Sequence, residues 1–518
     1  MTLERGPQTP QAARPLRDVR IDARGGIGRL RSLQGISGPP RPPVRQAMTD
    51  AHFFEGWAPF LRWTGADVSD GYRRARIDLV RNHEMPGPGD IDARYSGEIT
   101  LADGSKLSLA EFNAKVIFPN MDADPSDPAS YNFGPTDELL KSIVDIGASI
   151  FFRIGRTLMA DSTPPDPTKY AEIVKHVVMH YNMGWSDGFH YNIRYWEIWN
   201  EPDFNFGLGF WNGTPEQYYD LYEAVARAVK AVDPTLLVGG PATAMPTDST
   251  PYREPFLRHA RDRRIPLDFY SWHWYSNGSH DPFDFSLIAD DLRRMLDEHG
   301  FAETLVVLNE WNCGIRLNEA VHLTSAGRAS FMTTAALYMQ DAPIDLALYY
   351  NGYTPFGVDG KSPNQVGHAL IAQGMLQDTP LRLPLTGADQ AGFAAIAGKS
   401  EDDKTIQILI SNFEIPAEYM EPRPEGDVVA MPPGVAGGQK TYPKRRRFNY
   451  ADNGGYDLRV EHLPPDVEYE IRRFRISDGD NFDLIAASRA TGPTIHIPSA
   501  IPSPAIDLVI IRESAAGA

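Results

Sequence analysis

Short apolar runs alternate with amphipathic stretches over most of the first 370 residues. The runs with the length and composition of strands are residues 32–37, 77–83, 149–155, 195–200, 236–240, 267–274, 305–310 and 346–350. Several of them are continuously apolar or β-branched, which is typical of parallel strands that are buried on both faces. The pattern therefore predicts a parallel sheet whose strands are connected by helices.

Two amphipathic stretches indicate the connecting helices. Residues 136–146 predict a helix with Thr136 as its cap and Gly147 at its end. Residues 215–232 predict another, with Thr214 as the cap and Pro215 at the first helical position. This interleaving predicts an α/β fold, a (β/α)8 TIM barrel at residues 30–370. A doubly wound open sheet is the alternative, but no glycine-rich dinucleotide motif follows the first strand.

After about residue 370 the pattern changes to short alternating segments such as KTIQILISNF and AIDLVIIRES, separated by turn residues. They predict an accessory β-sandwich domain at residues 371–518, with a long insertion near 414–456. We expect residues 1–29 to form an N-terminal arm and to add a strand, residues 18–24, to the sandwich. A second insertion, residues 84–133, carries a predicted hairpin at 99–107 and is expected over the carboxyl-terminal face of the barrel.

Composition and charge exclude several classes of partner. The chain has 518 residues, too many for one core, and its net charge of −18 opposes binding to nucleic acid. The one basic run, residues 444–447, is short and is interpreted as a solvated turn. No segment reaches the roughly 18 uninterrupted apolar residues of a membrane span. The acidic composition is compatible with a monomer or a homo-oligomer.

The single cysteine, Cys313, excludes an intrachain disulfide, and the N-terminal residues contain no apolar signal-peptide core. A cytoplasmic location is therefore expected. Asp122, Asp124 and Asp127 have spacings that a calcium loop could use. They lack the full EF-hand pattern and stand beside prolines, so we expect no metal and no cofactor.

Two predicted strand ends carry the candidate chemistry. The segment YWEIWNEPD contains Glu201, and LVVLNEWN contains Glu310. Barrel enzymes place their active sites at the carboxyl ends of the strands. Glycoside hydrolysis uses two carboxylates, one protonated to assist the leaving group and one ionised to attack the anomeric carbon. A lone glutamate at a strand end is ordinarily a surface or capping residue, but two Asn-Glu pairs beside tryptophans favour a catalytic pair.

Aromatic residues near the two glutamates suggest how the pair is tuned. A desolvating shell raises the pKa of an acid, and hydrogen-bond donors keep a nucleophile charged. We expect five tryptophans to supply that shell and to stack on sugar rings: Trp199, Trp211, Trp272, Trp274 and Trp311.

At these motifs the sequence resembles glycoside hydrolase family 39, the β-xylosidase and α-L-iduronidase family of retaining (β/α)8 glycosidases. WEIWNEPD is similar to the acid/base motif of the family, and VVLNEWN is similar to its nucleophile motif. The segments YNFGPTDELLKSIVDIGASIFFRIG, EQYYDLYEAVARAVKAVDPTLLVGGPA and LDFYSWHWYS resemble other helices and strands of the barrel. The resemblance covers roughly residues 30–370, with NEP, HWY and NEW in the family's order.

The resemblance implies that Glu201 is the acid/base and Glu310 the nucleophile. It implies that Asn200 binds the sugar 2-hydroxyl, that His83 reaches the terminal sugar, and that Tyr275 lies beside the nucleophile. The remaining substrate-binding candidates are His273, Trp311 and Tyr350. The eighth strand lacks the tryptophan that xylosidases usually carry, and the insertion after His83 is longer than theirs. Both departures affect the choice of substrate.

The leading hypothesis is a retaining exo-glycosidase acting on an oligosaccharide or glycoside, with a β-xyloside as the first candidate. The same mechanism could serve an arabinoside, galactoside, glucoside or uronide, or cleave inside a polysaccharide. A uronide would require a cation such as Arg81, Arg153 or Arg156. A non-catalytic carbohydrate-binding protein on a hydrolase scaffold is disfavoured, because such proteins usually lose one carboxylate.

Overall fold

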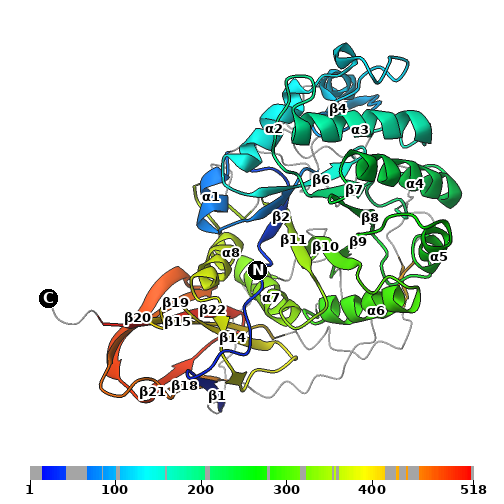
Figure 1. The fold of residues 1–518 in the computed structure, drawn as a ribbon. Helices are drawn as coiled ribbons and strands as arrows, with labels where there is room; N and C mark the ends of the chain where they lie inside the picture. The colour runs from blue at the N-terminus through cyan, green and yellow to red at the C-terminus, as the bar shows by residue number, and fades with distance from the viewer. Residues whose placement is uncertain are drawn as a thin grey trace, which may run out of the picture.

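The computed structural model describes residues 15–41, 67–83, 86–100, 106–157, 160–204, 210–276, 281–314, 323–352, 355–356, 361–414, 428–430, 439–441 and 454–514. Within these residues the chain forms a closed barrel of eight parallel strands ringed by helices, with a four-stranded and a six-stranded sheet beside it and two separate strand pairs (Figure 1). The predicted barrel fold with an accessory β-sheet domain is confirmed. The first 14 residues, most of the 414–456 insertion and the basic run at 444–447 lie outside the described residues.

Each barrel strand overlaps one of the predicted runs. The strands are β2 (Gly35–Ser37), β3 (Leu79–Arg81), β6 (Ser149–Ile154), β7 (Tyr195–Ile198), β8 (Leu237–Thr243), β9 (Phe269–Tyr275), β10 (Leu305–Asn312) and β11 (Leu346–Tyr350). Strands β8 and β9 approach so closely that a Cβ atom at Gly239 would lie 2.1 Å from the carbonyl oxygen of Phe269. Only glycine fits at that point of the wall.

The described helices are α1 (Ser69–Arg74), α2 (Gly134–Val144), α3 (Pro167–Met183), α4 (Pro215–Val232), α5 (Glu254–Arg263), α6 (Asp284–Glu298), α7 (Ser325–Met339) and α8 (Gln365–Met375). Helix α4 has the predicted bounds, and Thr214 caps it in a reciprocal pair of bonds with Gln217. The prediction that Thr136 caps α2 was wrong. The helix begins two residues earlier, and the Thr136 hydroxyl accepts the backbone N–H of Gly89. No described helix is long and apolar enough to cross a bilayer.

The 84–133 insertion lies on the side of the barrel where α2 and α3 pack (Figure 1). It contains the predicted hairpin, formed by β4 (Glu98–Thr100) and β5 (Lys106–Ser108), and the short 3-10 helices η2 (Leu109–Lys115) and η3 (Pro128–Ser130). Two buried ion pairs attach it to the carboxyl end of β6. Asp90 lies 2.8 Å from Arg153, and Asp92 lies 2.6 Å from Arg156. These pairs hold the insertion against the edge of the barrel mouth.

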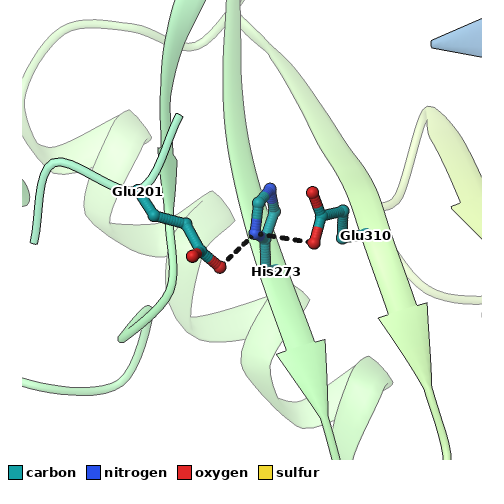
Figure 2. A group of neighbouring side chains, drawn as sticks. All are labelled: Glu201, His273 and Glu310. Atoms are coloured by element: carbon teal, nitrogen blue, oxygen red, sulfur yellow. Dashed lines mark hydrogen bonds and ion pairs between the residues drawn. The ribbon is translucent and has the colours of Figure 1, made fainter. Parts of the chain in front are cut away.

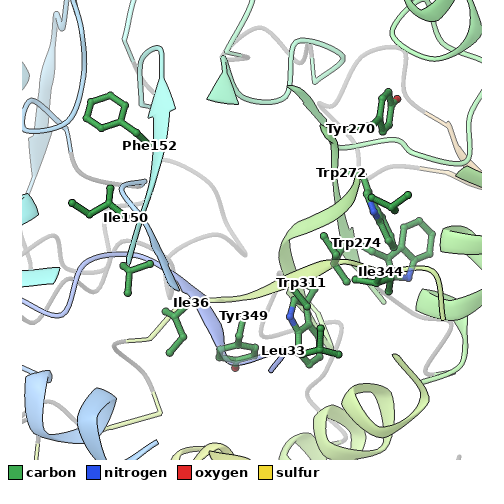
Figure 3. Packing of buried hydrophobic residues seen from close by; sticks show 14 of the residues in the cluster. Leu33, Ile36, Ile150, Phe152, Tyr270, Trp272, Trp274, Trp311, Ile344 and Tyr349 are labelled. Carbon is green, nitrogen blue, oxygen red and sulfur yellow. The ribbon is translucent and has the colours of Figure 1, made fainter. Parts of the chain in front are cut away.

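Inward-facing side chains divide the barrel interior into an apolar and a polar level. The apolar level contains Leu79, Phe151, Phe269, Val307 and Leu348. Toward the carboxyl ends of the strands the buried side chains become polar, and Arg81, Arg153, Glu197, Ser271 and Asn309 are all fully buried. Outside the wall, a large apolar cluster fills the space between strands and helices (Figure 3). The barrel is therefore a packed core with a polar upper end.

The accessory domain is a sandwich of two sheets. One contains β13 (Leu385–Thr386), β1 (Leu16–Asp22), β18 (Gly455–Glu461) and β21 (Ile495–Ala500), and the other contains β12 (Leu381–Arg382), β14 (Phe393–Lys399), β15 (Thr405–Asn412), β22 (Ala505–Glu513), β19 (Glu468–Ser477) and β20 (Asn481–Thr491). Strand β1 pairs in parallel with β18. Alternate residues of both sheets, including Val19, Leu458, Ile408 and Val509, share one apolar core. A separate strand pair, β16 (Val428–Ala430) and β17 (Gln439–Thr441), is described within the insertion.

The six-stranded sheet also packs against the barrel helices. Ile396, Leu409 and Leu508 belong to the apolar cluster that surrounds the barrel. Ser330 of α7 and Ser411 of β15 form a buried hydroxyl pair at this contact, and Thr334 donates to Ser411 as well. The sheet is therefore buried on both faces, which explains why β15 is almost continuously apolar.

Candidate active site

Glu201 lies on a sharp turn that follows β7. Trp199 and Glu201 adopt left-handed backbone conformations, with φ angles of 75° and 42°. The backbone N–H of Glu201 donates to the carbonyl oxygen of Ala242, which lies at the register shift near the end of β8. A non-glycine residue in this conformation is strained and is found mostly where surrounding contacts hold it. The turn therefore fixes the Glu201 carboxyl at the mouth of the barrel.

Glu310 lies on β10 at a β-bulge. The register between β10 and β9 shifts between Leu308 and Glu310, so that the chain carries one extra residue there. A bulge redirects side chains that would otherwise alternate between the two faces. Asn309 and Glu310 both reach buried polar groups of the interior, whereas Leu308 and Trp311 pack in the outer cluster. The bulge is what places two consecutive polar side chains inside the barrel.

His273 of β9 lies between the two glutamates (Figure 2). Its Nδ1 atom is 2.7 Å from Oε1 of Glu201 and 3.4 Å from Oε2 of Glu310. One carboxylate oxygen of each glutamate and the ring nitrogen lie within 4.8 Å of one another, and all three residues are buried. The structure thus brings together three residues that lie on different strand ends and are far apart in the sequence.

Three further side chains contact the Glu310 carboxylate. Arg81 Nη1 donates to Oε1 at 2.7 Å, and the Tyr275 hydroxyl donates to Oε2 at 2.6 Å. The Nε2 atom of His83 lies 3.1 Å from Oε1. These contacts come from β3, from the residue two places beyond it and from β9. Strand ends from separate parts of the barrel wall therefore converge on one side chain. Charge-assisted bonds of this length are stronger than neutral ones.

The surroundings of Glu310 favour its ionised form. Burial alone would raise the pKa of the Glu310 carboxyl. In the acidic range where this carboxyl titrates, however, His273 is protonated, and its charge, the hydrogen bond from His83 and the charge of Arg81 hold the pKa of Glu310 far below its usual range. Burial lowers the pKa of His273 to about 4, so the ring is neutral at pH 7. Arg81 then supplies the permanent positive charge. Burial and the Glu310 charge raise the pKa of Tyr275 well above its usual value, which keeps its hydroxyl a donor.

Asn200 and Tyr350 complete the set of predicted residues at the barrel mouth. The Asn200 Oδ1 atom accepts from Arg81 Nη2 at 2.6 Å, and its Nδ2 atom has no hydrogen-bond partner among the described residues. This leaves one buried N–H donor of Asn200 without a partner among the described residues. The ring of Tyr350 packs edge to face against Tyr275, with centroids 5.8 Å apart. Tyr350 therefore buttresses the tyrosine that binds Glu310.

The structure places the predicted tryptophan shell elsewhere. Trp311 is 2% exposed and packs against Phe285 of α6 and Tyr349 of β11, on the outer side of the wall (Figure 3). This contradicts the expected substrate contact of Trp311. Trp272 and Trp274 flank the inward His273 and lie in the same outer cluster, and Trp199 packs edge to face against Trp211. Because successive strand residues face opposite sides, these rings stabilise the barrel wall.

Four functional contacts were missing from the sequence interpretation. Arg81 binds Glu310 directly, Glu197 accepts from Arg81, and Asn309 donates to Glu197. Asp203 accepts the backbone N–H groups of Ala244 and Met245, each at 2.9 Å. The available signal was an ionisable residue at an inward position of an otherwise apolar strand, as Glu197 is in YWEI.

Among the described residues, Glu201, His273 and Glu310 form the group whose nitrogen and oxygen atoms lie close enough together to ligate a metal ion. The guanidinium group of Arg81 lies 2.7 Å from Glu310, and its positive charge would repel a metal ion bound by that carboxylate. Asp124 and Asp127 belong to the segment whose spacing a calcium loop could use. Their carboxylates accept hydrogen bonds from the backbone N–H groups of Ser126 and Ala129 in the same loop. The donor set at the barrel mouth suits proton transfer and nucleophilic attack.

Known proteins share these motifs. The sequence model of glycosyl hydrolases family 39 matches residues 121–349, which include both glutamates. The chain is 32% identical to a β-xylosidase of Geobacillus stearothermophilus over 178 residues, 31% of this chain and 34% of that protein. The match thus spans about a third of the length of this relative.

Solved structures match over nearly the whole chain. A crystal structure of a glucosidase from Croceicoccus marinus is 32% identical, with a TM-score of 0.80 over 97% of this chain and 100% of that one. A monomeric β-xylosidase from Caulobacter crescentus CB15 has the same fold at 15% identity, with a TM-score of 0.64 over 96% of this chain and 100% of that one. On the family match and the shared architecture, this chain belongs to glycosyl hydrolases family 39.

Proposed function

We propose that the protein is a retaining glycoside hydrolase in which Glu310 is the nucleophile and Glu201 the acid/base. The observation that carries the proposal is the distance between the two carboxylates, since one oxygen of each lies within 4.8 Å of the other. Retaining pairs stand roughly 5–5.5 Å apart, whereas inverting pairs stand roughly 6.5–9.5 Å apart to admit a water molecule. The spacing here leaves room for direct attack on the sugar.

The contacts of the two glutamates support this division of roles. Glu310 receives donors from Arg81 and Tyr275, which stabilise a carboxylate. Glu201 lies beside His273, whose neutral ring adds no positive charge at pH 7. Glu201 is also buried, and burial favours the protonated, neutral form of a carboxyl. Glu310 is thus suited to attack and Glu201 to donate a proton.

In the first step, the Glu310 carboxylate attacks the anomeric carbon while the glycosidic bond breaks and the Glu201 proton passes to the leaving oxygen. The product is an ester between the sugar and Glu310. In the second step, the ionised Glu201 takes a proton from water, the water oxygen attacks the anomeric carbon, and Glu310 leaves. The free Nδ2 donor of Asn200 is placed to bind the sugar 2-hydroxyl in both steps.

Two measurements test this mechanism. Proton NMR of the first product should show the same anomeric configuration as the substrate. A 2-deoxy-2-fluoro glycoside with a good leaving group should trap the ester, and peptide mapping should place the label on Glu310. A product of the opposite configuration, or a label on another residue, would refute the assignment.

Two substrates are supported by the relatives. A β-xyloside is supported by the β-xylosidases of Geobacillus stearothermophilus and Caldicellulosiruptor saccharolyticus, which are 32% and 29% identical over 178 and 166 residues. A glucoside is supported by the glucosidase of Croceicoccus marinus, which is similar over the whole chain. Comparing kcat/KM on nitrophenyl xylosides and glucosides of both anomers separates them. Arabinosides, galactosides and polysaccharides complete the panel, and activity on polysaccharide alone would indicate endo action.

A uronide is the least favoured sugar. Each arginine that could bind its carboxylate already has a buried acidic partner. Arg81 pairs with Glu197 and Glu310, Arg153 with Asp90, and Arg156 with Asp92. Recruiting one of them would leave a buried carboxylate unpaired, which is costly. Turnover of a nitrophenyl uronide at a rate near that of the best neutral sugar would contradict this exclusion.

A further inference from the structure

A third carboxylate, Glu197, lies inside the barrel next to the proposed catalytic pair. It is fully buried, and its two oxygens have different partners. Oε2 accepts from Arg81 Nε at 2.7 Å, and Oε1 accepts from Asn309 Nδ2 at 2.5 Å. A buried carboxylate is costly unless it is paired and hydrogen-bonded. Both partners of Glu197 belong to the surroundings of Glu310.

The first partner links Glu197 to two residues of the site. Arg81 donates from Nε to Glu197, from Nη1 to Glu310 and from Nη2 to Asn200. The guanidinium group is planar and rigid, so fixing its Nε side fixes the directions of the other N–H bonds. The orientation of the donors to Glu310 and Asn200 therefore depends on Glu197.

The second partner links Glu197 to the backbone that carries the nucleophile. Asn309 immediately precedes Glu310, and both lie at the bulge of β10. A bulge interrupts the regular strand pairing, so the local backbone depends more on side-chain contacts. The bond from Asn309 to Glu197 holds this irregular segment against β7. Glu197 thus reaches Glu310 by two independent routes.

The positive charge of Arg81 interacts with Glu197 as well as with Glu310. Burial would lower the pKa of Arg81, but the negative charges of Glu197 and Glu310 outweigh it and raise that pKa. Without the charge of Glu197, the full charge of Arg81 would act on Glu310. A carboxylate held by an unshared buried cation is a weaker nucleophile, because its negative charge is stabilised more before attack than during it.

We propose that Glu197 is a positioning residue for this site: it holds Arg81 and Asn309 in place and moderates the charge that Arg81 exerts on Glu310. The proposal rests on the assignment of Glu310 as the nucleophile. It predicts that Glu197 contributes to the rate of sugar transfer to Glu310 rather than to substrate affinity.

The test is the substitution Glu197→Gln, which keeps the size of the side chain and removes its charge. We expect kcat, and the rate constant for trapping by the 2-deoxy-2-fluoro glycoside, to fall by about 10–1000-fold, as for loss of a preorganised charge contact. KM and the inhibitor's binding constant should change by less than about threefold. A trapping rate constant within twofold of the original would overturn the proposal.

A matched control separates positioning from general destabilisation. Asp507 of β22 is also fully buried and pairs with an arginine, Arg475, and with the Tyr456 hydroxyl, but it lies in the sandwich. Asp507→Asn should lower the urea unfolding midpoint without slowing the trapping step per folded molecule. If both variants slow trapping to the same extent, the effect is structural and the proposal fails.

A second variant decides the matter if Glu197→Gln does not fold. Asn309→Ala removes one partner of Glu197 and leaves the pair with Arg81 intact, and we expect the trapping rate constant to fall by about 3–30-fold with KM unchanged. An unchanged rate constant would refute the proposal. Labelling of the unsubstituted enzyme tests the nucleophile separately. A label on Glu310 with a fast Glu197→Gln variant disproves only the role of Glu197, whereas no label on Glu310 disproves the proposed function.

Discussion

The Tyr275 hydroxyl donates a 2.6 Å hydrogen bond to Oε2 of Glu310, the carboxylate oxygen opposite to the one that Arg81 binds. Each oxygen of the carboxylate thus has its own donor, one charged and one neutral. The neutral donor is held by its edge-to-face contact with Tyr350. This arrangement fixes the plane of the carboxylate relative to the barrel mouth, and its components can be removed one at a time.

Tyr275→Phe should lower kcat by about 10–100-fold, because a hydrogen bond to a charged group contributes about 1.5–3 kcal/mol. Steady-state kinetics on the best nitrophenyl substrate measure this. Tyr456→Phe is the matched control, since its hydroxyl also donates to a buried carboxylate, Asp507, at 2.7 Å in the sandwich. The control should lose stability and keep kcat/KM within about twofold. Equal kinetic losses in both variants would argue against a specific role for Tyr275.

The pH dependence of stability should carry the signature of His273. Burial lowers the pKa of its ring from 6.5 to about 4, so between these values the unfolded chain binds a proton that the folded protein does not. Acidification through this window therefore favours unfolding, by at most about 3 kcal/mol at its lower end. At pH values below the usual pKa of a glutamate, the depressed pKa of Glu310 lowers the stability of the folded protein further.

Urea unfolding midpoints at several pH values between 4 and 6.5, for the original protein and for His273→Gln, isolate this contribution from the other histidines. The variant should show a shallower loss of stability on acidification. Parallel curves for the two proteins would show that His273 is not held neutral in the folded state.

Asp203 is expected to influence the alkaline limit of activity. Burial raises the pKa of its carboxyl to about 6, and the nearby charge of Glu201 adds to the rise. This coupling is mutual, so an ionised Asp203 opposes ionisation of Glu201. Asp203→Asn should therefore move the alkaline limb of the kcat/KM profile to lower pH, by about half a unit.

The control for Asp203 is Asp345→Asn. Asp345 also accepts a backbone N–H, that of Val306, but at the amino-terminal end of β10. Its variant should lose stability and leave the pH profile in place. If the alkaline limb of Asp203→Asn coincides with that of the original enzyme, Asp203 only anchors the turn.

Trp311→Phe should lower stability by about 1–3 kcal/mol, because it shrinks a side chain in a packed core. KM should stay within about twofold, since the ring contacts Phe285 and Tyr349 on the outer side of the wall. Trp196→Phe is the comparison, because Trp196 of β7 is equally buried and packs against Phe152. A rise in KM confined to Trp311→Phe would mean that this ring touches the sugar.

The barrel was predictable because each strand is a buried run whose length and flanking residues differ from those of the helices. The convergence of Glu201 and Glu310 followed from one rule, that parallel strands end at the same face of a barrel. Asn200, His273 and Tyr275 were added to the site only by the family resemblance. The family resemblance then supplied expected roles for these positions. Neither step required a side-chain distance.

The wrong predictions about the site concern the direction in which side chains point, and not the strands on which the residues lie. Trp272 and Trp274 alternate with His273 along β9, so strict alternation already turns them away from the site. The bulge at Asn309 breaks that alternation on β10, and nothing in LVVLNEWN marks it. The links among Arg81, Glu197 and Asn309 depend on the stagger between strands, which a sequence pattern does not contain.

The parallel pairing of β1 with β18 has a consequence for synthesis. Residues 16–22 are synthesised before the strands of the barrel, but their partner, residues 455–461, is made only after all of those strands. The barrel can therefore complete its own pairing while the opening strand of the chain still lacks its place between β13 and β18. The four-stranded sheet can be completed only after every strand of the barrel has been made, and it ties a segment that precedes the barrel to one that follows it.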